Sequence, residues 1–80
     1  MNLLKSVVKA VARAANNANS NRKRDNVQKL TYEQTGRQLE KAKKTGKFVN
    51  ASALYQKNLE KNKRKIEQKH SNLEKFIDSI

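Results

Sequence analysis

The chain has 80 residues, which limits it to one small domain. Nineteen Lys and Arg against seven Asp and Glu give a formal net charge of +12, and Cys, Pro and Trp are absent. These features exclude disulfides, cysteine-based zinc sites and thiol nucleophiles, and they argue against a large core with a buried catalytic pocket. The sequence therefore predicts a protein that is not an enzyme and that holds no cofactor or metal.

The first pattern along the chain is an amphipathic helix over about residues 3–18. Its apolar residues recur at the spacing of one helix face, whereas Lys5, Lys9 and Arg13 line a different face. The stretch 16–21 is rich in Asn and Ser, which form helix poorly, so we expect the helix to end there. The chain is thus expected to divide into an N-terminal helix or arm, 1–20, and a basic helical region, 21–80.

A short middle helix is expected next, over about residues 26–44. It follows a polar linker that contains three consecutive cations, Arg22, Lys23 and Arg24. Gly46 comes just after the basic turn Lys43-Lys44, which is the usual place of a glycine that ends a helix. The middle helix is therefore expected to stop before Gly46.

The clearest pattern is a heptad-like seam in the last part of the chain. From Phe48 to Ile80 the steps between seam positions alternate between four and three residues, as they do in coiled coils. The predicted packing or oligomer seam comprises Phe48, Tyr55, Leu59, Asn62, Ile66, Leu73, Phe76 and Ile80. It predicts a long helix over about residues 50–79, in an all-α helical hairpin or three-helix arrangement. The seam is expected to pack on the earlier helices or, alternatively, on a second copy in a coiled coil.

Three clusters of basic residues are the candidate binding residues. Lys outnumbers Arg by fourteen to five, and Lys binds phosphate as a point charge whereas Arg is the commoner reader of guanine. The pattern therefore favours contact with a nucleic-acid backbone over reading of bases. The predicted nucleic-acid-binding residues are Arg22, Lys23 and Arg24; Lys41, Lys43, Lys44 and Lys47; and Lys57, Lys61, Arg64 and Lys65.

The composition supports one leading function and two alternatives. The leading expectation is a small basic structural protein that docks on nucleic acid within a larger assembly, such as a virion or a ribonucleoprotein particle. One alternative is a helical interaction module, such as a phage-type inhibitor or adaptor, that binds an acidic protein surface or other subunits through its seam or its N-terminal helix. The other is peripheral membrane binding through the N-terminal helix. Since no uninterrupted apolar leader is present, we expect a protein of the cell interior or a virus particle, not a secreted one.

Overall fold

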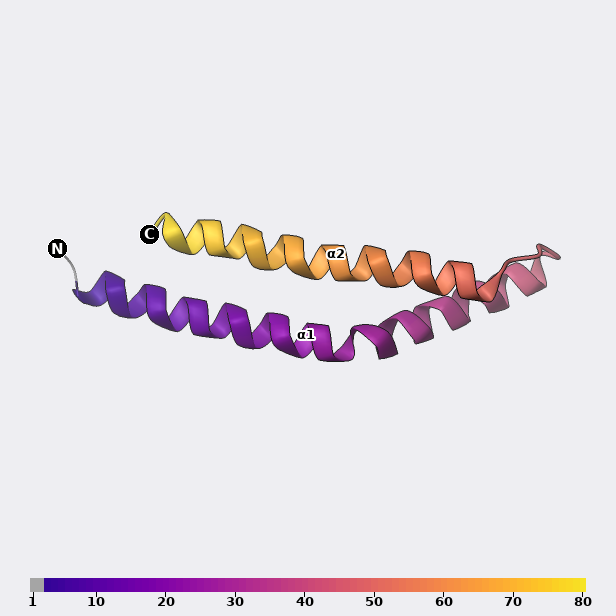
Figure 1. Cartoon of the computed structure of the whole chain (residues 1–80), viewed down its shortest axis with the longest axis horizontal. Coiled ribbons are helices and arrows are strands. Elements are labelled where there is room, and N and C mark those ends of the chain that lie inside the picture. The colour runs from indigo at the N-terminus through magenta and orange to yellow at the C-terminus, as the bar shows by residue number, and fades with distance from the viewer. Residues whose placement is uncertain (1–2) are drawn as a thin grey trace.

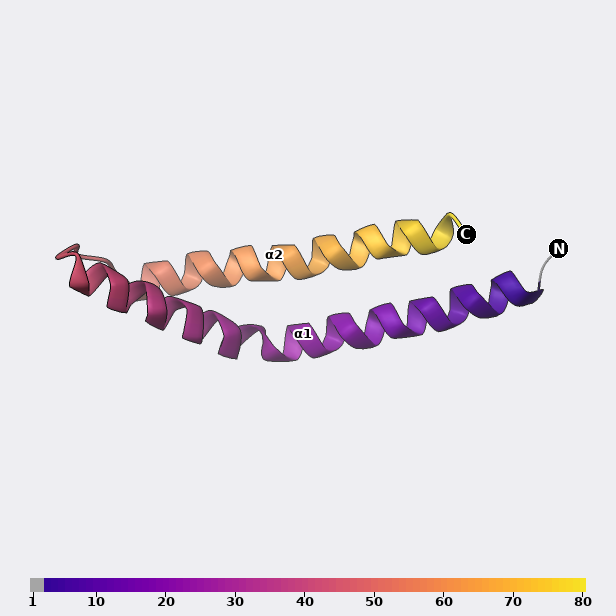
Figure 2. The same ribbon diagram turned by 180° about the vertical axis from the view of Figure 1, so that it is seen from behind.

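Two antiparallel helices form the protein. The computed structural model describes residues 3–80 and consists of α1 (Leu3–Lys44) and α2 (Ala51–Asp78), which lie side by side (Figures 1 and 2). At about 1.5 Å per residue, the 42 residues of α1 account for the longest extent of the molecule, 64 Å. We call the end near Leu3 and Ile80 the open end, and the end formed by residues 45–50 the closed end. The all-α class is confirmed.

The predicted helix break at residues 16–21 is wrong, because α1 continues through this stretch. Asn16 and Ser20 are buried against α2, and the Asn16 side-chain amide donates a hydrogen bond to the backbone carbonyl of His70 at 3.2 Å. These contacts with α2 outweigh the weak helix propensity of Asn and Ser. The N-terminal and middle helices are therefore one helix, and the described chain has two helices where three were expected.

The closed end confirms the predicted helix stop at Gly46. Gly46 has a φ of 72°, and its N–H bonds to the carbonyl of Lys43 at 3.2 Å, while the N–H of Lys47 bonds to the carbonyl of Ala42 at 3.0 Å. These two bonds form a Schellman motif, which needs the left-handed conformation that glycine adopts without strain. The Asn50 side chain then caps α2 by accepting a bond from the N–H of Ala53 at 3.1 Å.

The contact between the helices is mostly polar. In the described part of the chain, the buried apolar residues are Val27 and Ile77, and they are outnumbered by the buried polar residues Asn16, Ser20, Thr31, Thr35 and Asn58. Such a contact gains little from the hydrophobic effect. The hairpin is therefore expected to have a low free energy of unfolding.

Two equivalent hydrogen-bonded clusters fix the register of the helices. Asn58 and Asn62, one turn apart on α2, each donate from the side-chain amide to a Thr hydroxyl and a Gln carbonyl oxygen on α1. The partners are Thr35 (3.1 Å) and Gln38 (2.7 Å) for Asn58, and Thr31 (3.0 Å) and Gln34 (3.0 Å) for Asn62. A shift by one turn would leave a buried polar group without its partner, which is costly.

The buried residues do not follow the expected heptad. On α1 the positions that face α2 are spaced by three, four and four residues, so the pattern repeats every eleven residues; they include Ala12, Asn16, Ser20, Lys23, Val27, Thr31 and Gln34. This period is close to that of a straight helix, whereas a heptad needs a left-handed supercoil. On α2 a straight course turns the heptad positions away from α1 by about 20° per heptad. Tyr55, Leu59, Asn62 and Ile66 are therefore half-buried, while Leu73, Phe76 and Ile80 remain exposed.

Candidate nucleic-acid interface

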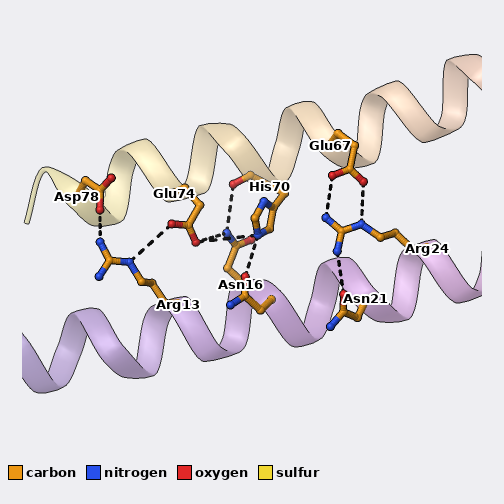
Figure 3. Close-up of polar contacts among 9 residues, drawn as sticks. Arg13, Asn16, Asn21, Arg24, Glu67, His70, Glu74 and Asp78 are labelled. Atoms are coloured by element: carbon orange, nitrogen blue, oxygen red, sulfur yellow. Dashed lines mark hydrogen bonds and ion pairs between the residues drawn. The ribbon is translucent and has the colours of Figure 1, made fainter.

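The groove between the two helices opens on two flanks, and one of them carries Glu67, Glu74 and Asp78 of α2. Three ionic contacts cross this side, which we call the ladder flank (Figure 3). The Arg24 guanidinium group donates to both carboxylate oxygens of Glu67 at 2.7 Å. Arg13 pairs with Glu74 and with Asp78. Beside these ion pairs, a hydrogen bond of 2.8 Å joins His70 Nε2 and Asn17 Oδ1. The two bonds from Arg24 lower the pKa of Glu67, and the same contact raises the pKa of Arg24. On the ladder flank, the acids of α2 are therefore paired with the arginines of α1.

The opposite side, which we call the groove flank, is cationic. A cavity of about 530 Å³ opens on it between the helices, and none of the residues around it is acidic. Arg22 and Lys23 come from α1 and Lys65 comes from α2, while Leu30 and Ile66 supply apolar surface. The fold thus brings together cations from two of the three predicted clusters, although they lie more than forty residues apart in the sequence.

Lys23 and Lys69 meet across this flank. The neighbouring Lys69 ammonium group, together with partial desolvation and the charge of Arg22, lowers the pKa of Lys23. A like charge at close range disfavours the protonated form, and a bound anion would relieve that repulsion. The groove flank therefore has the electrostatic character of an anion-binding surface.

A row of lysines on α2 extends the groove flank. Lys57, Lys61, Lys65 and Lys69 are each four residues apart, so they lie in one row along the helix, and all four are exposed. Sequence reasoning missed Lys69, which lies seven residues after the seam residue Asn62 and therefore at a heptad position. The four-residue spacing from Lys65 was the signal that could have identified it.

The remaining predicted cations lie elsewhere. Arg24 belongs to the ladder flank, where Glu67 engages its guanidinium group. Arg64 is exposed on the outer side of α2. Lys41, Lys43 and Lys44 form the last turn of α1, where cations favourably oppose the helix dipole, and Lys47 follows in the closed end. About 33 Å of helix separates Arg22 from Lys44, so this third cluster is apart from the groove.

Among the predicted seam residues, Asn62 and Ile66 line the cavity on the groove flank. Leu59 and Tyr55 are half-buried nearer the closed end. Phe48 lies before α2 and is 97% exposed. The seam is thus split between the contact with α1 and the protein surface.

Residues 3–80 contain no group of three or more His, Asp and Glu side chains arranged to hold a metal ion. No helix in this range is both long and apolar enough to span a bilayer. No protein-family model matches the chain, and comparison with curated proteins and with solved structures gave no match.

Proposed function

We propose that this is a non-enzymatic protein that binds the phosphate backbone of nucleic acid along its groove flank. The observation that supports the proposal is that cations from both helices gather on one side of the hairpin, while Glu67, Glu74 and Asp78 of α2 pair with arginines on the other. Four cations from distant parts of the sequence, Arg22, Lys23, Lys65 and Lys69, form the centre of this surface. A polyanion is the partner that offsets their mutual repulsion.

The composition of the surface favours binding that is independent of base sequence. Lysine supplies point charges that suit phosphate oxygens and does not require the fixed geometry of a base edge. No aromatic residue lines the cavity, so it offers no platform on which bases could stack. The proposed role is that of a structural component that docks on nucleic acid in a larger assembly, inside a cell or in a virus particle.

The salt dependence of binding tests this proposal. Six cations lie on or beside the groove flank, namely Arg22, Lys23, Lys57, Lys61, Lys65 and Lys69. If four to six of them contact phosphates of duplex DNA, log affinity should fall linearly with log salt with a slope of about −4 to −5. Fluorescence anisotropy with two duplexes of unrelated sequence should give the same slope for both.

Absence of binding at low salt, or an affinity that is insensitive to salt, would contradict the proposal. In that case an acidic protein surface would become the better partner for the same cations. A partner protein would bind with one defined stoichiometry, whereas bound nucleic acid should take up more protein as its length increases.

A further inference from the structure

The open end of the hairpin exposes a group of apolar side chains on both helices. On α1, Leu4 is 75% exposed, Val11 63% and Val8 46%. On α2, Phe76 is 66% exposed and Leu73 is 37% exposed, and Ile80, two residues beyond the end of α2, is also 37% exposed. We call these six residues the open-end patch.

Helix periodicity places the open-end patch on the groove flank. Eighteen residues make five full turns and eleven make about three, so Leu4 lies in line with Arg22 on α1, and Leu73 lies in line with Asn62 on α2. By the same eleven-residue spacing, Val11 also lies in line with Arg22, and Phe76 lies in line with Lys65. Since Arg22, Asn62 and Lys65 line the cavity of the groove flank, the patch continues that side of the hairpin toward the open end.

The surroundings of the open-end patch on the groove flank contain no acidic residues of the described chain. The first acidic residue of the chain is Asp25, so the whole N-terminal part of α1 is free of acids. The acids nearest the C-terminus, Glu74 and Asp78, contact Arg13 on the ladder flank (Figure 3). The groove flank therefore presents an apolar end followed by a cationic middle, with its lining free of acids.

We propose that the open-end patch lies in the interface of an anionic lipid bilayer, with the cations of the groove flank at the level of the headgroups. An anionic bilayer supplies both an apolar interior and a negative surface, which matches the two parts of this side. Nucleic acid, in contrast to a bilayer, has no apolar interior into which the side chains of the patch could insert. A second copy would bring two chains of net charge +12 together, which electrostatic repulsion opposes.

The shape of the open end suits a helix that lies along a membrane surface. Arg13 pairs with Asp78, the last residue of α2, so the first turns of α1 extend beyond α2 (Figure 1). These turns carry Leu4 and Val8 with no helix of the described chain covering them. No described helix is apolar enough to span a bilayer, so the contact is peripheral. The apolar part of the inference rests on the patch alone, whereas its cationic part uses the same groove-flank residues as the proposed function, so lipid and nucleic acid would compete for them.

Vesicle co-sedimentation of the full chain tests the inference. Vesicles of phosphatidylcholine with phosphatidylserine should bind the protein, whereas vesicles of phosphatidylcholine alone should bind it much more weakly. Phe76→Asp should weaken binding to the anionic vesicles by about tenfold or more, because it replaces a membrane-buried ring by a charge. The matched control is Phe48→Asp, which changes an exposed Phe at the closed end and should bind as the unaltered protein does.

Three results would overturn the inference: no binding to anionic vesicles, equal loss in Phe76→Asp and Phe48→Asp, or a dimer in sedimentation velocity that Phe76→Asp dissociates. The last result would assign the patch to a second copy. Circular dichroism should show the same helicity in both variants, because each changes an exposed residue. The slope of DNA binding against salt should also be the same in both, which separates failure of this inference from failure of the proposed function.

Discussion

Val27→Lys is expected to unfold the hairpin. Val27 is only 5% exposed and lies at the middle of α1, beside Ile66 of α2. Arg24, Lys63 and Glu67 also line this hollow, but Glu67 is already paired with Arg24, so a lysine at position 27 would have no unengaged acid beside it. An unpaired buried charge costs about 3–5 kcal/mol, which is comparable to the whole stability of so small a core. Far-UV circular dichroism at about 25 °C should therefore show that most of the helical signal is lost.

The matched control is Val11→Lys on the same helix. It makes the same chemical change at a side chain that is 63% exposed, so the melting curve should stay close to that of the unaltered protein. Lysine forms helix at least as well as valine, so a loss confined to Val27→Lys reports on burial and not on helix propensity. Two variants with equally small effects would show that α1 does not pack on α2 through Val27.

Replacing Arg22, Lys23, Lys65 and Lys69 together by Gln is expected to remove most of the affinity for nucleic acid. Each phosphate contact that is lost should reduce the magnitude of the salt slope by about 0.9, so the slope should decrease by about 3 to 4. The affinity at low salt should fall by about a hundredfold or more, equally for unrelated sequences. The fold should be retained, since Gln is a good helix former and the change removes the repulsion between Lys23 and Lys69.

The control for this variant removes the same charge from another place. Lys41, Lys43, Lys44 and Lys47 at the closed end are changed to Gln, which also lowers the net charge by four. If the groove flank is the binding surface, the control should lose much less affinity than the groove variant. Equal losses would show that binding follows net charge alone, and an unchanged slope in the groove variant would assign the contact to other residues.

Local rules were enough to predict several parts of the fold. The helix stop at Gly46 and the long last helix follow from glycine conformation and apolar periodicity, and both are confirmed. The predicted helix break at residues 16–21 was wrong because helix propensity takes no account of burial, and Asn16 is buried and hydrogen-bonded to α2. The heptad was misleading for a similar reason, since the exposed Phe76 fits its spacing but does not face α1.

The candidate site could be predicted only in part. Lys57, Lys61 and Lys65 share one helix, so their alignment follows from their spacing. The meeting of Lys23 with Lys69 depends on the register of two helices, which the polar clusters around Asn58 and Asn62 determine. Arg24 was grouped with Arg22 by sequence, yet a helix directs residues two positions apart to different sides, and Glu67 lies beside Arg24.

The central claim is that the groove flank binds phosphates, and the pKa of Lys23 tests it most directly. Side-chain NMR should find this pKa below its ordinary value in the free protein, because the Lys69 ammonium group favours the neutral form. Adding a short DNA duplex should raise it, because a nearby phosphate favours the protonated form. An ordinary pKa in the free protein would contradict the meeting of Lys23 with Lys69, and a pKa that does not change when DNA binds would contradict phosphate binding at the groove flank.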